Sequence, residues 1–258
     1  PAWPPDLVRH DSGAEAALGK EFARFWVHNG FVQIDSEKMS KSLGNFKTIR
    51  DILEQRQPET LRFFLLGKHY RSPIDFSFDG MDDAERGLKR VYECLAEAER
   101  ARARAAWKPG SLPDEVTREF DDLNRAFFEA MDDDFNTAAA LGHVFGIVRL
   151  VNRVLEDKPL KNCQGAAELL EKFARAAADW SATLGVFGAR PEVFLRELRD
   201  TRAGRLGLDT ARVENLLAER SEARAAKDFT RADAARDALS ALGVQVRDTP
   251  EGPVWDIL

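Results

Sequence analysis

"MDDAERGLKRVYECLAEAERARARAA", residues 81–106, is the longest helical pattern in the chain and decides its fold class. It mixes apolar and charged residues at helical spacing and contains no proline. Such a pattern is typical of an amphipathic helix that buries one face against other helices. The sequence therefore predicts one long helix over residues 81–106, and a chain that is mainly α.

More helices are predicted after this stretch. The loop signal "WKPGSLP" at 107–113 is followed by helical patterns over residues 114–131, 137–155 and 165–184. Helices of this length joined by short polar breaks are typical of an antiparallel bundle. The sequence thus predicts a helical bundle over residues 81–190 and a linker over 191–207.

The regions on either side of the bundle contain strand signals. Before it, "FVQID" at 31–35 alternates apolar and polar residues, Thr48 and Asp51 have capping-box spacing, and Pro58 suits the first turn of a helix. After it, helices are predicted over 209–227 and 230–242, followed by two short strands around a turn. Residues 208–258 are therefore predicted to form a small α/β domain.

Composition narrows the class of protein. The chain has 258 residues, 44% of them hydrophobic, and no apolar run that approaches the roughly 18 residues of a membrane-spanning helix. Cys94 and Cys163 lack CxxC spacing, which argues against a disulfide framework. The net charge of −6 hides an asymmetry, because residues 20–71 are mildly basic and 73–135 are acidic. We expect a cytoplasmic protein without a membrane partner.

The stretch "SEKMSKSLGNFKTIRDIL", residues 36–53, places lysines, hydroxyls and a glycine ahead of a well-started helix. Gly44 permits backbone conformations that other residues resist. Ammonium groups beside hydroxyls suit a polyphosphate whose charge rises during transfer, because donors placed at developing charge lower the barrier. The spacing of a Walker A loop is absent. A solvated surface loop is the alternative for this composition.

The pentapeptide Lys38-Met39-Ser40-Lys41-Ser42 resembles the second signature of the class I aminoacyl-tRNA synthetases. Five segments resemble the bacterial cysteinyl-tRNA synthetases in order: "FARFWVHNGFVQIDSEKMSKSLGNFKTIRDIL", "ETLRFFLLGKHYRSPIDFS", "MDDDFNTAAALGHVF", "ARAAKDFTRADAARDAL" and "DTPEGPVW". The resemblance covers about residues 13–255. It implies a cysteine–tRNA ligase, in which ATP with Mg²⁺ activates cysteine and the cysteinyl group passes to tRNA(Cys). Residues 1–80 would then be the C-terminal part of the catalytic domain, a remnant of the class I nucleotide-binding fold.

The resemblance also implies roles for individual residues near the loop. Those carried over for ATP are Lys38 and Lys41, which are also the implied catalytic residues, with Ser40, Ser42, His28 and Asn29. Lys41 is the main contact. For His28 and its neighbour Trp26, scaffold residues are the alternative, because an aromatic before a strand is more often core than ligand contact.

The chain departs from the family in two places. The first signature, His-Ile-Gly-His, is absent, and the family's zinc ligands are two cysteines, a histidine and a glutamate. Alignment places Asp6 and His10 at the last two positions, and no cysteine precedes Cys94. This donor set falls short of a tetrahedral site, so we expect no metal site. We expect a C-terminal fragment that is inactive alone, with a tRNA-binding relic as the alternative.

The tail supplies the residue types that read single-stranded bases, namely carboxylates, arginines and aromatic rings. By resemblance, Arg224, Asp233 and Asp248 contact the anticodon, and Phe229 and Trp255 supply rings.

Each of these tail residues also has a structural alternative. Asp233 has capping-box spacing from Thr230, Asp248 could start a turn, and Arg224 could be a solvated helix residue. Trp255 could be the core of a very small domain.

The interpretation is therefore a mainly α chain with a remnant of a nucleotide-binding fold, a helical bundle and a small anticodon-binding domain. It is expected to act as a monomer that binds tRNA(Cys), ATP and cysteine. A helical adaptor without an RNA role is one rival. A cysteine ligase with a small amine acceptor is another, although such relatives are not expected to keep the anticodon-type tail.

Overall fold

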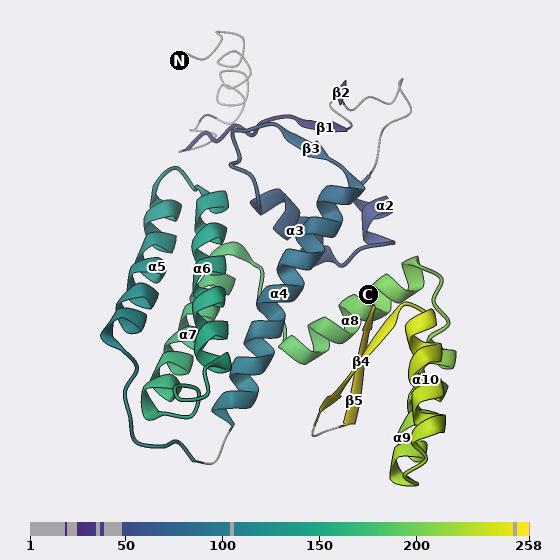
Figure 1. The fold of residues 1–258 in the computed structure, drawn as a ribbon. Helices are drawn as coiled ribbons and strands as arrows, with labels where there is room; N and C mark the ends of the chain where they lie inside the picture. The colour runs from purple at the N-terminus through teal and green to yellow at the C-terminus, as the bar shows by residue number, and fades with distance from the viewer. Residues whose placement is uncertain are drawn as a thin grey trace.

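The computed structural model describes residues 19, 25–34, 37–38, 48–103, 106–249 and 252–257, and for residues 37, 38 and 249 the backbone alone. Within these ranges the chain has a small sheet near its N-terminal end, a helical bundle and an α/β tail (Figure 1). The prediction of a mainly α fold is confirmed.

The described part of the small sheet has the strand order β2-β1-β3. Strand β1 (Val32–Ile34), predicted from its alternation, pairs antiparallel with β2 (Glu37–Lys38) and parallel with β3 (Ile74–Phe76). A parallel pair needs a crossover connection, and helices α2 (Ile49–Leu53) and α3 (Pro58–Leu66) lie within it.

The start of β1 packs closely against the chain that leads into β3. Gly30 donates its N–H to the carbonyl of Tyr70 at 2.7 Å, and a Cβ at this position would lie 2.3 Å from the carbonyl oxygen of Ser72. Only glycine fits an approach this close.

Four long helices form the bundle: α4 (Phe78–Arg102), α5 (Asp114–Asp132), α6 (Thr137–Glu156) and α7 (Gln164–Leu184). The predicted ends are close, but α4 starts three residues before residue 81 and ends before 106. Its start is set by Ser77, whose Oγ accepts a hydrogen bond from the N–H of Gly80 at 3.1 Å. The predicted boundary between residues 80 and 81 therefore falls inside a helix.

Helix α6 is long and apolar enough, by length and composition, to cross a membrane. The helix is not an uninterrupted apolar run, because it contains His143, Arg149 and Arg153, so the expectation that no such run approaches that length stands. Residues Val144, Ile147 and Val151 of α6 are fully buried in the bundle core. The core helix of a bundle and a spanning helix share this composition, because both are surrounded by apolar groups.

Residues 191–207, predicted as a linker, contain helix α8 (Pro191–Arg205), so that prediction is wrong. Pro191 occupies the first turn, and Phe194 and Leu198 are buried against the bundle core. The ring of Phe194 stacks on Tyr92 of α4 at 3.8 Å between centroids. The many charged residues of this segment hid the narrow apolar stripe that makes it a helix.

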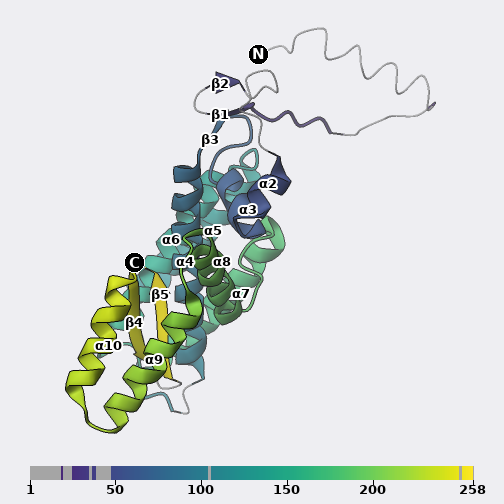
Figure 2. The same cartoon turned by 90° about the vertical axis from the view of Figure 1, so that its right-hand side faces the viewer.

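The tail consists of α9 (Thr210–Ala225), α10 (Phe229–Ala241) and the antiparallel hairpin of β4 (Val244–Thr249) and β5 (Gly252–Ile257), as predicted for a small α/β unit. It has an apolar core of its own that includes Leu217, Leu239 and Trp255. In both views α8 lies between the bundle and the tail (Figures 1 and 2).

Candidate nucleic-acid interface

The pentapeptide at residues 38–42, called the signature loop below, begins in strand β2 and is followed by helix α2. The backbone of Lys38 pairs with Gln33 at the end of β2, whereas Ser40, Lys41 and Ser42 lie outside the described residues. On the other side, the predicted capping box is confirmed: Thr48 N–H donates to Asp51 Oδ2 at 2.8 Å, and Asp51 N–H donates to Thr48 Oγ1 at 3.1 Å. The loop thus leads directly into a capped helix, α2.

His28 and Asn29 precede β1 at the same end of the molecule. The His28 ring is partly buried and stacks on Trp26, with 6.5 Å between centroids and an interplanar angle of 19°. Asn29 is exposed. Both residues therefore stand next to the strand that leads into the signature loop, and their role toward ATP stays a prediction.

The tail carries a cluster of charged side chains built on α9 and β4. Arg220 donates both Nη atoms to the two carboxylate oxygens of Asp248, at 2.8 and 3.0 Å. Arg224, one helical turn further on, also donates to Asp248 Oδ2. The hydrogen bond from Arg220 and that from Arg224 hold the pKa of the Asp248 carboxyl well below its usual range.

This geometry places Asp248 within strand β4, opposite Pro253, so the alternative that it starts the turn is wrong. Arg220 was missed from the sequence. Its spacing of four residues from Arg224 puts both on one helix face and was the available signal. The cluster is partly exposed: the side chains of Asp248 and Arg224 keep 49% and 51% of their surface, whereas that of Arg220 keeps 12%.

Helix α10 adds Asp233 and Phe229 to this part of the tail. The helix is capped by Asp228, which accepts a hydrogen bond from the N–H of Arg231 at 3.1 Å, so the capping alternative for Asp233 is wrong. Asp233 is exposed, and its charge contributes to a raised pKa of Arg220, behind the larger effect of Asp248. Phe229 is 68% exposed at the first position of the helix.

Trp255 corrects the prediction of an anticodon contact. It is 4% exposed and belongs to the core of the tail. Its Nε1 donates to Glu214 at 2.8 Å, and the guanidinium of Arg199 on α8 lies 4.2 Å from the ring centroid. The ring is therefore covered by protein and cannot stack on a base, which leaves Phe229 as the exposed ring.

A second polar cluster joins the sheet to the bundle. Asp134, in the connection from α5 to α6, accepts hydrogen bonds from the Tyr70 hydroxyl at 2.6 Å and from Arg71 at 3.0 Å. The bond from Arg71 lowers the pKa of Asp134, and the bond to Asp134 raises that of Tyr70. Asp134 has a positive φ of 55°, a conformation rare outside glycine, which these contacts hold in place.

The two cysteines are placed as core residues. Burial raises the pKa of the Cys94 thiol to about 12, and Cys163 is buried at the start of α7. A thiol with so high a pKa stays protonated and is a poor metal ligand. Within the described ranges no three His, Cys, Asp or Glu side chains gather as a metal site would require, and Asp6 and His10 lie outside them.

Comparison with known protein families agrees with the order of these parts. A model of the class I (C) tRNA synthetase catalytic domain matches residues 9–86, the DALR domain matches 126–188, and the cysteinyl-tRNA ligase anticodon binding domain matches 210–255. The chain is therefore related to the class I aminoacyl-tRNA synthetases.

Individual relatives narrow this class. Cysteine–tRNA ligases of Nitratidesulfovibrio vulgaris (strain Hildenborough) and Oleidesulfovibrio alaskensis are 63% and 60% identical, over 95% and 94% of this chain and 50% of each relative. That of Lawsonia intracellularis is 50% identical over 99% of this chain and 56% of the relative. The chain is homologous to the cysteine–tRNA ligases, which confirms the resemblance, and spans about half the length of the curated relatives it matches.

Proposed function

We propose that this chain supplies the tRNA-binding tail and one wall of the ATP site of a cysteine–tRNA ligase. In that reaction cysteine attacks the α-phosphate of ATP, which gives cysteinyl-adenylate and pyrophosphate, and the cysteinyl group then passes to the 3′ end of tRNA(Cys). Lys41, with Lys38, would contact the phosphates of ATP and its Mg²⁺ complex. Positive charge there stabilises the pyrophosphate as it leaves.

The observation that carries the proposal is a cluster in which Asp248 and Arg224 are exposed and the mostly buried Arg220 holds Asp248 in place. A carboxylate has about four lone-pair sites, and three hydrogen bonds from the two arginines leave it an acceptor for a base amino group. Arg224, whose side chain is 51% exposed, is held by Asp248 where it can also donate to a base edge. Phe229 offers a ring on which a base can stack.

RNA titrations test the tail. We expect the wild-type chain to bind tRNA(Cys) less tightly when salt rises, because phosphate contacts release counterions. Asp248→Ala should weaken binding of the tRNA(Cys) anticodon stem-loop by about 1–3 kcal/mol and leave an unrelated stem-loop of equal length unaffected. Fluorescence anisotropy at two salt concentrations measures both. Asp179→Ala, at an exposed position of α7, is the control for the lost charge.

Two results would count against the proposal. Equal loss for both stem-loops would make Asp248 a structural residue of the tail. Failure of the wild-type chain to bind tRNA(Cys) at either salt concentration would favour the rival interpretation, a helical adaptor without an RNA role.

A further inference from the structure

The segment between α2 and α3, which follows the signature loop and its capped helix, contacts α8 at several points. Gln57 Nε2 donates to Thr201 Oγ1 at 3.1 Å in the C-terminal half of α8. Arg205, the last residue of α8, donates to the carbonyl of Gln55 at 3.4 Å. These residues lie more than 140 positions apart in the chain, so only the fold brings them together.

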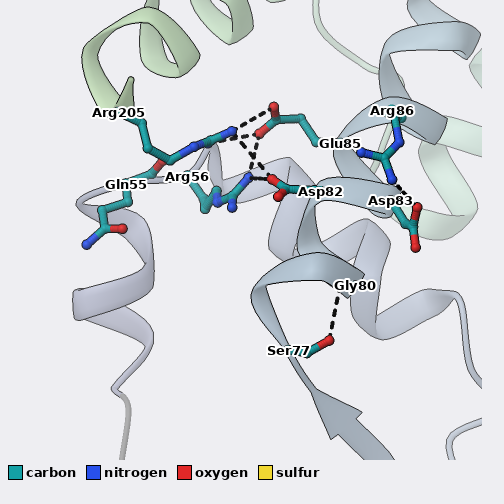
Figure 3. A network of polar contacts seen from close by, with 9 residues as sticks. All are labelled: Gln55, Arg56, Ser77, Gly80, Asp82, Asp83, Glu85, Arg86 and Arg205. Atoms are coloured by element: carbon teal, nitrogen blue, oxygen red, sulfur yellow. Dashed lines mark hydrogen bonds and ion pairs between the residues drawn. The ribbon is translucent and has the colours of Figure 1, made fainter. Parts of the chain in front are cut away.

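A charge cluster closes the same contact at the C-terminal end of α8 (Figure 3). Glu85 of α4 accepts from Arg56 at 3.1 Å and from Arg205 at 3.1 and 3.2 Å. Asp82 accepts from Arg56 at 2.5 Å and lies 3.5 Å from Arg205. Two guanidinium groups from distant segments thus share two carboxylates of one helix, and the cluster is formally neutral.

Burial restricts the arrangement of the side chains in this cluster. The side chains of Arg56 and Glu85 are 3% and 8% exposed. Removal of one partner from a buried pair leaves an uncompensated charge in a poorly solvated place. The cluster therefore has one strongly preferred arrangement, which defines where α8 ends relative to α2 and α4.

The connection from α7 to α8 is held from α3 and α4. The carboxylate of Glu59 accepts from the N–H of Phe187 at 2.6 Å and from the Tyr92 hydroxyl at 2.9 Å. The Tyr92 hydroxyl in turn accepts from the N–H of Ala189 at 3.2 Å. The connection that leads into α8 is thus tied to α3, and the C-terminal part of α8 is tied to the segment between α2 and α3.

The tail also packs against helix α8. Ala203 of α8 belongs to the apolar core of the tail, and Arg199 covers the ring of Trp255. Lys89 of α4 forms an ion pair with Asp256 of β5. Because the tail contacts both α8 and α4, a displacement of α8 relative to α4 would disturb the position of the tail.

We propose that Arg205 and Glu85 are positioning residues, which fix α8 as a strut between the signature-loop side of the molecule and the anticodon surface. The strut sets the span and orientation at which one tRNA can meet both regions. Only the part of this inference that concerns tRNA binding rests on the proposed function. The rigid link itself is a property of the free protein.

The first experiment measures the link without RNA. Spin labels are placed at Arg50→Cys on α2 and Arg236→Cys on α10, with Cys94 and Cys163 replaced by alanine, and distances are measured by double electron–electron resonance. We expect a narrow distribution that broadens in Arg205→Met and is restored in part by Arg205→Lys, which keeps the charge. Glu97→Gln, which breaks only the half-exposed pair with Arg100 on α4, should leave it narrow.

The second experiment compares two RNAs. Arg205→Met should weaken whole tRNA(Cys) by about tenfold and leave the isolated anticodon stem-loop within about twofold, because only the whole tRNA needs two surfaces at a set spacing. If Arg205→Met does not fold, Thr201→Val removes the Gln57 contact with little change of shape and serves instead.

The outcomes separate the two claims. An unchanged distance distribution in Arg205→Met, or equal weakening of both RNAs, would overturn the strut. Failure of the wild-type chain to bind either RNA would contradict the proposed function, while the distance measurement would still decide the strut.

Discussion

The bundle and the tail both contain helices, but they differ in how much apolar surface they bury. The bundle buries a large apolar cluster that includes Phe127, Phe173 and Trp180, all fully enclosed. The tail has a much smaller core, centred on Leu239 and Trp255. A domain of about fifty residues buries too little apolar surface for much stability of its own. Docking on α8 and α4 therefore supports the tail, and this leaves its outer surface available for charged side chains.

The largest effect should come from the bundle core. Trp180→Ala removes a buried ring that packs on Phe127 and Phe173, and we expect the free energy of unfolding to fall by about 3–5 kcal/mol. Urea denaturation followed by circular dichroism measures it. Phe135→Ala, at a 58% exposed ring, should change stability by less than about 0.5 kcal/mol. Similar losses in the two variants would show that the bundle is not held by its core.

The two aromatic residues of the tail should behave oppositely. Phe229→Ala should weaken the tRNA(Cys) anticodon stem-loop by about 1–3 kcal/mol through lost stacking, with stability unchanged. Trp255→Phe loses the hydrogen bond to Glu214, and should destabilise the tail by about 1 kcal/mol without weakening RNA binding. Anisotropy titration and hydrogen exchange in residues 206–257 measure the two quantities, and the reverse pattern would contradict the assignment of Trp255 to the core.

The smallest expected effect is the pH dependence of the stability of the tail. It compares the contribution of the ion pairs of Asp248 with that of the buried core. The pKa of Asp248 is lowered in the folded tail, so the folded state binds fewer protons than the unfolded state near pH 4. Its contribution is fully present above the unfolded pKa of about 3.9 and is lost as the pH falls through the folded value. Because the Asp248 side chain is 49% exposed and its charge is screened by solvent, we expect less than about 1 kcal/mol.

Acid unfolding of the tail, followed by hydrogen exchange or tryptophan fluorescence, tests this sign. Asp248→Asn should remove that part of the pH dependence. If the variant and the wild-type chain lost stability in parallel between about pH 5 and pH 2, the pair with Arg220 would not contribute.

Local signals predicted most of the fold correctly. Thr48 with Asp51, Pro58 and the long helical patterns each determine structure through bonds within a few residues, so neighbouring sequence is enough to find them. Helix α8 was missed because Phe194 and Leu198 form a narrow stripe among charged residues, and the stripe becomes meaningful only when the bundle lies opposite. Its stability comes from tertiary packing more than from propensity.

The candidate site likewise contains some residues that were predicted from the sequence and others that only the structure revealed. Arg224 and Asp248 were found from the order of residue types and from resemblance, while Arg220 required the contact between α9 and β4. Trp255 and Phe229 are both aromatic residues in the tail, and no local pattern separates the buried ring from the exposed one. The separation depends on which of them Arg199 and Glu214 reach.

The amino-acid sequence by itself determined the helical class, the order of the parts and the starts of α2 and α3, because these depend on residues close together in the chain. Tertiary structure alone decided that the predicted linker is a helix, that Trp255 is core, and that Arg56 and Arg205 share the carboxylates of α4. The physical reason is that burial and ion pairing join residues from different elements, from 26 to 123 positions apart in this cluster, and such contacts leave no periodic signal in the sequence.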